Sequence, residues 1–316
     1  MRVLVTGVGA IIGYGVINSI RNYDKHILIV GMDIYSDAVG QYWCDQFVQA
    51  KPASSEEYPQ FLQEVIKQYE IDLVIPCIEQ DISRMLAIQP LFAEHAVKFV
   101  LPNKDIHHIT QDKYLTYLAL MKNNINAIPS YIDGNYELFV KQLGSPFLLK
   151  PRRSYASKGI VKIENEEDLC YWRKKIGDNF MVQQIVGDND HEYTASIFGL
   201  GNGQYKNSII FKRKLSGEGA TAKAEVIFDN DLLIEITKLT RLFKPSGPTN
   251  FQFRKHDGQY LLLEINPRIS SSTSIREAFG YNEARMCIEY YLYHNEPYNV
   301  EVIKGKAIRY IKDMIC

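Results

Sequence analysis

The first hundred residues alternate short apolar stretches with helical ones, and this alternation limits the fold more than any other feature of the chain. The predicted strands are Arg2–Thr6, Ile27–Asp33, Leu73–Pro76 and Phe99–Leu101. The predicted helices between them are Ile11–Asn22, Tyr58–Tyr69 and Ile82–Gln89. Strands that alternate with helices form βαβ units around a parallel sheet. We therefore expect a Rossmann-like α/β domain at the start of the chain.

A second unit of different character begins near Lys104. It contains a predicted helix at Lys113–Asn124 and an apolar strand at Pro146–Lys150. From about Met181 onward strands dominate, with one predicted helix at Asp231–Phe243 packed between them. The predicted strands are Tyr193–Leu200, Ser208–Lys214, Asn250–Arg254 and Tyr260–Asn266. This pattern predicts an α+β body after the α/β domain.

Charge and cysteine content exclude several classes of protein. The 316 residues carry 36 Lys and Arg against 37 Asp and Glu, so no strongly basic face is indicated and nucleic acid is not an expected partner. The longest apolar runs are far shorter than the ~20 residues that span a bilayer, and the N-terminus lacks the features of a signal peptide. The five cysteines are scattered without metal-ligand spacing. We expect reduced thiols in a cytoplasmic protein.

The segment from Asn250 to Arg268 is predicted to be a β-hairpin that turns at Asp257–Gly258. A two-residue turn and a three-residue loop over residues 256–258 are both common solutions. The three-residue loop places Asn250 opposite Glu264 and Gln252 opposite Leu262. We favour it because a shift of one residue would divide the apolar side chains between the two faces. One face of the hairpin is then apolar, consisting of Phe251, Phe253, Leu261, Leu263 and Ile265.

The other face of this hairpin would carry a cluster of oxygen ligands. Glu264 and Asn266 lie two residues apart on one strand, so their side chains point the same way, with Gln252 beside them. Mg²⁺ takes oxygen ligands, usually one or two carboxylates together with water and substrate phosphates. A solvated sheet face with no function is the alternative interpretation of the same residues.

Two further segments carry residues suited to a nucleotide. Lys150 ends an apolar strand and runs into a basic loop at Pro151–Gly159, where backbone N–H groups, hydroxyls and lysines could cover phosphates. An exposed basic turn is the alternative. Farther along, Gln183, Gln184 and Glu192 border an apolar segment and could contact an adenine edge and a ribose.

Taken in order, these segments resemble the ATP-grasp superfamily. The series runs from Asp112-Lys113 through Lys150 and its loop, then Gln184 and Glu192, to Glu264-x-Asn266-x-Arg268. It is most similar to the ATP-binding portion of carbamoyl phosphate synthase large chains and their single-copy relatives. The resemblance covers nearly the whole chain and implies three parts: a pre-ATP-grasp domain at 1–104, a small subdomain with a phosphate flap at 105–182, and a subdomain at 183–316 with an antiparallel sheet and a metal site.

The resemblance also assigns roles to individual residues. The implied ATP-binding residues are Lys113, Lys150, Ser154, Ser157, Gly159, Gln183, Gln184, Ile185, Val186, Glu192 and Leu262. The implied ligands of Mg²⁺ (or Mn²⁺) are Glu264, Asn266 and Gln252, and the implied catalytic residues are Arg268 and Lys150. The family's flap is usually rich in glycine, whereas this one has only Gly159.

The activity implied by the resemblance is that of an ATP-dependent ligase. Such an enzyme joins a small-molecule carboxylate to an amine through an acyl phosphate and releases ADP and phosphate. A small-molecule kinase and a non-catalytic ATP-binding protein are the alternatives. An NAD(P) oxidoreductase is a weaker one, prompted by Gly7, Gly9, Gly13 and Asp33, whose spacing is one residue off the dinucleotide motif.

Candidate substrate residues come from two other places. Glu79 follows a predicted strand, at the edge where α/β sheets bind ligands. Arg213, near the end of a predicted strand, and Glu218, in the segment after it, lie ahead of the hairpin and could meet an anionic substrate and an incoming amine. Members of the superfamily are often dimers, so a homodimer is an expected assembly.

Overall fold

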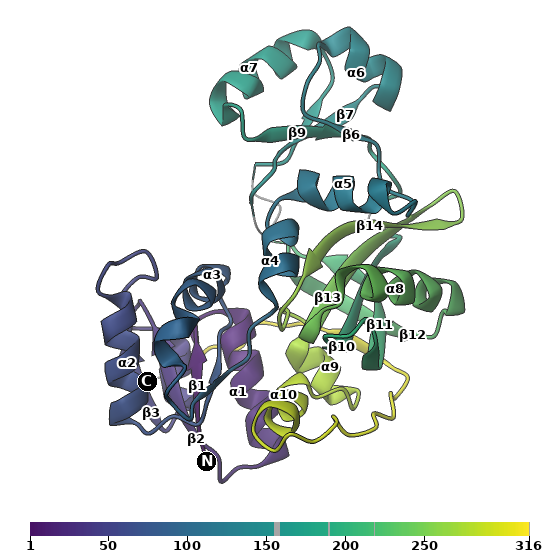
Figure 1. Cartoon of the computed structure of the whole chain (residues 1–316). Coiled ribbons are helices and arrows are strands. Elements are labelled where there is room, and N and C mark those ends of the chain that lie inside the picture. Colours follow the sequence, from purple (N-terminus) through teal and green to yellow (C-terminus); the bar gives the residue numbers. More distant parts are fainter. Residues whose placement is uncertain (155–158, 189, 218, 316) are drawn as a thin grey trace.

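The structure is a computed structural model that describes residues 1–154, 159–188, 190–217 and 219–315. Within these residues the chain forms three sheets, one after another along the sequence (Figure 1). The first is parallel and the other two are antiparallel. This arrangement confirms the predicted fold class of an α/β domain followed by an α+β body.

The first sheet has the strand order β3-β2-β1-β4-β5. Its strands are β1 (Arg2–Thr6), β2 (Leu28–Asp33), β3 (Gln46–Gln49), β4 (Leu73–Ile75) and β5 (Lys98–Phe99). The helices between them are α1 (Ile11–Tyr23), α2 (Tyr58–Gln68) and α3 (Glu79–Ile88), with short 3-10 turns at η1 (Val39–Trp43) and η2 (Gln89–Phe92). The edge strand β3 was not predicted, because its residues are half-buried or exposed and it has no apolar run.

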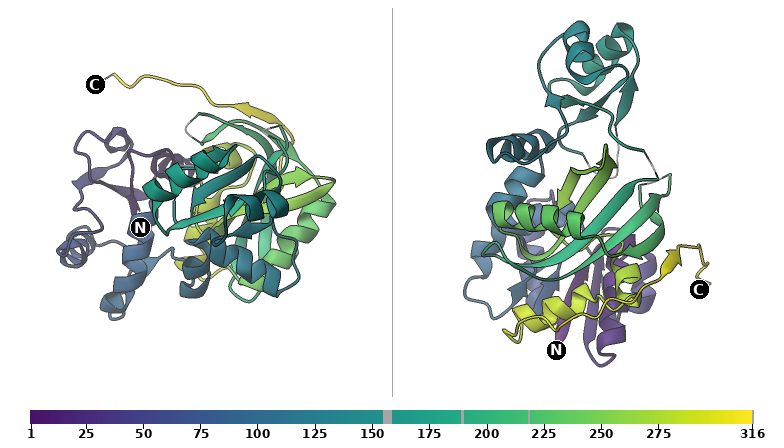
Figure 2. Two further views of the ribbon diagram at one scale, coloured as in Figure 1. Left: turned by 90° about the horizontal axis from the view of Figure 1, so that it is seen from above. Right: turned by 90° about the vertical axis from the view of Figure 1, so that its right-hand side faces the viewer.

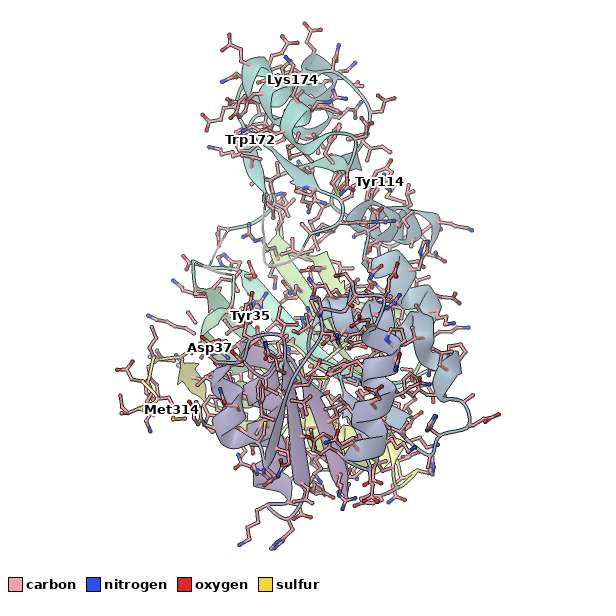
Figure 3. All side chains as sticks on the ribbon, turned by 90° about the vertical axis from the view of Figure 1, so that its left-hand side faces the viewer. Tyr35, Asp37, Tyr114, Trp172, Lys174 and Met314 are labelled. Carbon is pink, nitrogen blue, oxygen red and sulfur yellow. The ribbon has the colours of Figure 1, made fainter. Side chains whose placement is uncertain are left out.

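The small sheet has the order β6-β9-β7-β8 and lies at the far end of the molecule in Figure 1. It contains β6 (Ser130–Tyr131), β7 (Phe147–Pro151), β8 (Val161–Ile163) and β9 (Phe180–Gln183), with the helices α6 (Tyr136–Leu143) and α7 (Glu166–Ile176). Phe139 and Leu169 pack these helices onto the strands. Trp172 and Lys174 of α7 lie far from Tyr35 and Asp37 of the first unit (Figure 3).

Neither α6 nor α7 was predicted, although each has a helix-start signal. The side chains of Asn135 and Asn165 accept hydrogen bonds from the N–H groups of Leu138 and Asp168, which caps both helices. Two more helices, α4 (Lys104–Thr110) and α5 (Lys113–Lys122), lead from the first sheet to this small unit.

The large sheet has the order β14-β13-β10-β11-β12-β15. Its strands are β10 (Glu192–Leu200), β11 (Tyr205–Leu215), β12 (Thr221–Ile227), β13 (Ser246–His256), β14 (Gln259–Asn266) and β15 (Lys306–Ile308). The helix α8 (Asn230–Phe243) packs on one face, where Ile236 meets Phe251 in a common core. The helices α9 (Thr273–Ala278) and α10 (Glu283–Tyr291) join the other face to the first unit, and Phe211, Met286 and Val16 share a second core. Figure 2 shows α9 and α10 between the large sheet and the first unit.

The predicted register of the hairpin is wrong. His256 pairs with Gln259, so the turn has two residues, and both Asp257 and Gly258 adopt positive φ. A β-bulge then shifts the pairing by one residue, which leaves Gln252 opposite Glu264 rather than opposite Leu262.

The predicted faces of β14 are also wrong, because the bulge changes which side chains point into the core. Leu262 packs into the core with Phe253, while Leu261 and Leu263 lie on the opposite face with Ile128 and Val186. The polar face is nevertheless kept. Asn250 pairs with Asn266, next to the pair of Gln252 and Glu264.

No helix among the described residues has both the length and the apolar character needed to cross a membrane. The four described cysteines, Cys44, Cys77, Cys170 and Cys287, are free thiols.

Candidate active site

Two cavities meet where β14 approaches the small unit and the first unit. The larger has a volume of about 690 Å³ and lies between the small sheet and the large sheet. The smaller, of about 300 Å³, lies between β14 and the helices α3 and α4. Ser154 and Glu264 line both cavities. A group bound in one cavity is therefore next to a group bound in the other.

Two lysines project into the larger cavity from separate elements. Lys113 is the first residue of α5, and its ammonium group donates to the carbonyl of Ser154 at 2.8 Å. Lys150 lies on β7 and donates to Oε1 of Gln183 at 2.6 Å. Burial lowers the pKa of Lys150 to about 7, and the nearby charge of Lys113 acts in the same direction. Burial also lowers the pKa of Lys113, against the opposing effect of Glu264. An anionic ligand in this cavity would stabilise the charged form of both lysines.

The predicted adenine and ribose segment lines the same cavity. Its members there are Gln183, Gln184, Ile185, Val186 and Glu192. The backbone N–H of Gln184 also donates to the carbonyl of Pro129, the residue before β6. This hydrogen bond holds the segment next to β6. The structure thus brings the lysines and this segment together across 33 to 79 residues of sequence.

Two predicted residues lie elsewhere. Leu262 is in the core, and Leu263 lines the cavity in its place because of the bulge. Arg213 is buried and lines neither cavity; it donates to Glu192 at 3.0 Å and to Gln252 at 2.8 Å. Arg213 is therefore a hydrogen-bond partner of two residues that line the larger cavity.

Two of the predicted flap and acceptor residues, Ser157 and Glu218, lie outside the described residues. Gly159 is described, with a positive φ of 77°, and does not line either cavity.

The three predicted metal ligands share one face of the hairpin. Within the described part of the chain, the carboxylate of Glu264 accepts no hydrogen bond, and it borders both cavities. The side-chain oxygen of Asn266 accepts from Arg268 at 2.9 Å, and that of Gln252 accepts from Arg213. No group of three or more His, Cys, Asp or Glu that could hold a metal occurs among the described residues. One carboxylate with two amide oxygens fits Mg²⁺, which completes its shell with water and phosphate oxygens.

Arg268 lines the smaller cavity and is tied to the first unit. Its Nε donates to Oε2 of Glu79 at 3.2 Å, and the other oxygen of Glu79 lies 3.6 Å from Nδ1 of His107. Glu79 begins α3, directly after the strand β4. The predicted substrate residue and the predicted catalytic arginine thus meet across two sheets.

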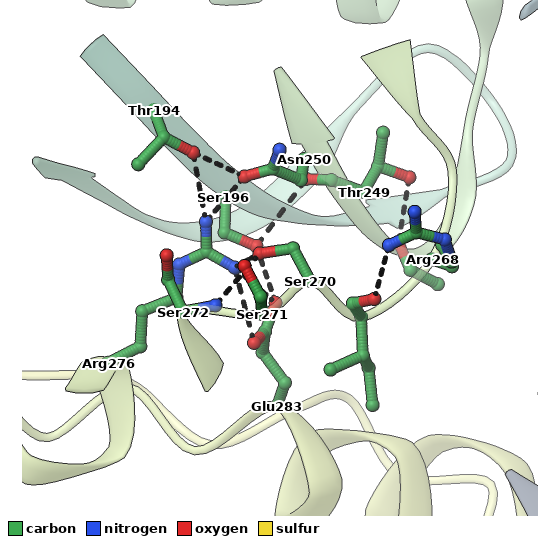
Figure 4. A network of polar contacts seen from close by, with 12 residues as sticks. Thr194, Ser196, Thr249, Asn250, Arg268, Ser270, Ser271, Ser272, Arg276 and Glu283 are labelled. Atoms are coloured by element: carbon green, nitrogen blue, oxygen red, sulfur yellow. Dashed lines mark hydrogen bonds and ion pairs between the residues drawn. The ribbon is translucent and has the colours of Figure 1, made fainter. Parts of the chain in front are cut away.

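A buried network supports the segment that follows Arg268 (Figure 4). Arg276 and Glu283 are fully buried and form an ion pair at 3.2 Å. Arg276 also donates to Ser270 at 2.7 Å and to Asn250, while Glu283 accepts from Ser196 at 2.6 Å. These contacts fix the loop after β14 to the strands β10 and β13.

Several residues that line the cavities were not predicted from the sequence. Arg254, Lys214 and Leu263 line the larger one, and Ser83 and Gln111 the smaller. Lys214 and Arg254 lie on β11 and β13, and no local motif marks either residue. Gln111 stands directly before the Asp112-Lys113 pair, which was the one available signal.

The glycine loop after β1 does not resemble an available dinucleotide site. Asp33, the acid that would bind a ribose, accepts hydrogen bonds from the N–H of Gly9 at 2.8 Å and from that of Tyr35 at 3.1 Å. Its carboxylate holds the loop of its own domain.

Comparison with known proteins supports one family. The family model described as "ATP-grasp in the biosynthetic pathway with Ter operon" matches residues 178–314. The whole described fold is similar to N5-carboxyaminoimidazole synthetase of Staphylococcus aureus in complex with ADP, with a TM-score of 0.75 and 18% identity over 95% of this chain and 79% of that one. Residues 178–314 are therefore similar to an ATP-grasp family, and the chain shares the fold of this synthetase.

Two other relatives agree with this assignment. The biotin carboxylase domain of the Hydrogenobacter thermophilus 2-oxoglutarate carboxylase, solved with MgADP, has a TM-score of 0.74 and 15% identity over 96% of this chain and 73% of its own. Formate-dependent phosphoribosylglycinamide formyltransferase of Prochlorococcus marinus (strain NATL2A) is 27% identical over 187 residues, 56% of this chain and 46% of the relative. The chain therefore matches less than half the length of that curated relative.

Proposed function

We propose that this chain is a member of the ATP-grasp superfamily, that it binds ATP and Mg²⁺, and that it uses them to join a small-molecule carboxylate to an amine. The supporting observation is the position of Glu264, which borders both the lysine-lined cavity and the cavity at Arg268. A nucleotide in the first would place its terminal phosphate beside an acid in the second. The ADP-bound synthetase that shares this fold is consistent with a nucleotide in the larger cavity.

The proposed reaction has two steps. A carboxylate oxygen attacks the γ-phosphorus of ATP, the bond to the β–γ bridging oxygen breaks, and ADP leaves. The amine then attacks the carbonyl carbon of the acyl phosphate, the bond from carbon to the phosphate oxygen breaks, and phosphate leaves as the amine loses a proton to solvent. This chemistry needs positioning and charge neutralisation more than a protein nucleophile.

Each site residue has a role that its contacts allow. Lys113 and Lys150 would bind phosphate oxygens, because their ammonium groups lie in the larger cavity. Glu264, Asn266 and Gln252 would hold Mg²⁺, which supplies charge stabilisation of the transferred phosphoryl group when it is bound. Arg268, oriented by Glu79, would hold the acid and the acyl phosphate.

The test is release of ADP and phosphate from ATP with Mg²⁺ across a matrix of carboxylic acids, with and without amines. Release that requires both an acid and an amine is the expected result. Release with an acid alone would indicate a kinase, and binding of ATP without release under any condition would indicate a non-catalytic protein. Either outcome contradicts the ligase proposal.

A cytoplasmic location and a homodimeric assembly stay predictions. The free thiols of the described cysteines are consistent with a reducing compartment. Size-exclusion chromatography with light scattering measures the assembly directly.

A further inference from the structure

The smaller cavity has a wall that offers hydrogen-bond acceptors. The hydroxyl of Ser83 donates to the carbonyl of Glu79 at 2.9 Å, and that of Thr110 donates to the carbonyl of Ile106 at 2.8 Å. Both hydroxyl protons are therefore used inside the protein. Ser83 Oγ also accepts from the amide nitrogen of Gln111 at 2.6 Å and lies 3.1 Å from Nε2 of His107, so it is Thr110 that offers its oxygen lone pairs to the cavity.

Gln111 strengthens this acceptor character. Its amide nitrogen contacts Ser83 at 2.6 Å and Nε2 of His107 at 2.7 Å, and His107 is buried behind the wall. Because the amide nitrogen of Gln111 contacts these two partners, its side-chain carbonyl oxygen is available to accept a hydrogen bond from a ligand. No described residue donates to that oxygen. Beside it lies the carboxylate of Glu79. A ligand group that faces this wall must carry N–H or O–H donors.

The charges that line the smaller cavity balance. Arg153 and Arg268 are positive, and Glu79 and Glu264 are negative. Both guanidinium groups already have acidic neighbours, since Arg268 pairs with Glu79 and Nε of Arg153 lies 3.7 Å from Asp112. A phosphate monoester needs a surplus of positive donors, which these residues do not provide. A ligand with one positive and one negative group matches them.

The smaller cavity has room for a small amino acid. Its volume is about 300 Å³. At ~30 Å³ for each water molecule of the liquid, this is the space of roughly ten waters.

We propose that the smaller cavity binds the carboxylate substrate and that this substrate is a small amino acid, with a free carboxylate toward Arg268 and a free ammonium group toward Glu79 and Gln111. That the ligand is a substrate rests on the proposed function. Its chemical class is inferred from the residues that line the cavity. It distinguishes this chain from the similar formyltransferase, whose name specifies a phosphoribosyl substrate.

The experiment measures binding rather than turnover. Isothermal titration calorimetry is run on the full chain with each standard amino acid, with its deaminated acid, and with ribose 5-phosphate, both with and without a non-hydrolysable ATP analogue and Mg²⁺. At least one small amino acid is expected to bind at least tenfold more tightly than its deaminated acid and than ribose 5-phosphate. Equal or tighter binding of either comparison ligand, or binding of no amino acid, overturns the proposal.

Two variants test the acceptor wall. Gln111→Leu removes the carbonyl acceptor and is expected to weaken amino-acid binding about tenfold, while binding of the deaminated acid changes less than about twofold. Gln60→Leu, on the exposed surface of α2, is the matched control and leaves both affinities unchanged. If Gln111→Leu binds neither the amino acid nor its deaminated acid, the substitution has disturbed the structure, and Glu79→Gln is tested instead. If Glu79→Gln still prefers the amino acid over its deaminated acid as strongly as the wild type does, the proposal is overturned.

A separate titration keeps this inference apart from the proposed function. A fluorescent ATP analogue reports on the larger cavity alone. If the amino acid binds but the nucleotide does not, the ligase proposal fails, whereas the proposal that the smaller cavity binds a small amino acid is supported. If the nucleotide binds and no amino acid does, the ligand class fails.

Discussion

Among single residues, Glu264 has the most unusual surroundings. It is a carboxylate at the border of two cavities, with the charges of Lys113 and Lys150 near it and no hydrogen-bond donor among the described residues. Most buried or half-buried acids are satisfied by the protein itself. Glu192, in contrast, is held by Arg213 and by Arg254. An unsatisfied carboxylate at this position is suited to a cation that arrives with a ligand.

Replacement of Glu264 tests that interpretation. Glu264→Ala is expected to reduce ADP release at least about 100-fold, because charge stabilisation of the transferred group is lost. Circular dichroism and the melting temperature should stay close to those of the wild type. Glu137→Ala, on the exposed surface of α6, is the matched control. Undiminished release by Glu264→Ala would contradict the assignment of the metal site.

The second prediction concerns the pH dependence of nucleotide binding. The pKa of Lys150 is lowered to about 7 mainly by burial, so the free protein loses the charge of this lysine above about pH 7. Bound phosphate favours the charged form and raises that pKa, so binding takes up a proton above pH 7. The affinity for ATP should therefore fall as the pH rises from 7 to 9, by at most about tenfold per pH unit.

Equilibrium titrations with a fluorescent ATP analogue at several pH values measure this effect. In Lys150→Met the affinity should be lower and the pH dependence much flatter, whereas Lys162→Met, at an exposed position on β8, should behave like the wild type. A pH-independent affinity in the wild type would show that Lys150 does not contact the nucleotide.

At the scale of elements, β14 decides what faces the cavities. A regular strand would alternate strictly, so that Leu263 and Glu264 would point to opposite faces. The bulge opposite Gln252 lets both side chains face the larger cavity, while Leu262 and Ile265 remain in the core. One extra residue therefore gives the strand both a nonpolar and an anionic contact in adjacent positions.

A pair of neighbouring substitutions tests the bulge. Leu262→Ala should destabilise the protein by about 2–5 kcal/mol, because it leaves a cavity in the core. Leu263→Ala should cost less than about 1 kcal/mol in stability but weaken nucleotide binding, because it removes part of the cavity wall. Urea denaturation and nucleotide titration of both variants measure the two effects. A large loss of stability in Leu263→Ala, together with weaker nucleotide binding in Leu262→Ala, would contradict the bulge and indicate a regular register.

At the scale of the whole molecule, the first unit is part of the site rather than an appendage. The helix α1 packs against α9 and α10, and the side chain of Asn282 donates to the carbonyl of Ser19 at 2.7 Å. The same packing brings Glu79 to Arg268. The smaller cavity exists only because the two units are held in this arrangement.

Gly15 provides a close approach at this junction. A Cβ atom added to Gly15 would lie 2.8 Å from Cγ2 of Thr273 in α9, closer than packed atoms allow. Gly15→Val should therefore destabilise the protein by about 1–3 kcal/mol and weaken ligand binding in the smaller cavity. Asn18→Val, on the exposed side of α1, controls for the effect of a β-branched residue in a helix. Equal stability of the two variants in urea denaturation would contradict the close packing of α1 against α9.

The sequence by itself determined the class of the fold and most of its elements. The predicted strands and helices of the first unit appear at nearly the expected positions, because a parallel sheet buries continuous apolar runs that are visible in sequence. The polar face of the hairpin was also predictable, since Glu264 and Asn266 are two residues apart. Short, polar or edge elements such as β3 and α7 were not, because their residues bury little apolar surface.

Only the tertiary structure decided which side chains form the cavities. Leu262 and Leu263 are identical in type, and a bulge placed by the partner strand determines which of them faces the ligand. Arg213 belongs to Glu192 because antiparallel pairing places the two residues opposite each other on β10 and β11. Ser83, Gln111 and Arg268 come from three elements far apart in the chain. Their proximity is a consequence of how the units pack, and no local pattern in a sequence encodes such a distance.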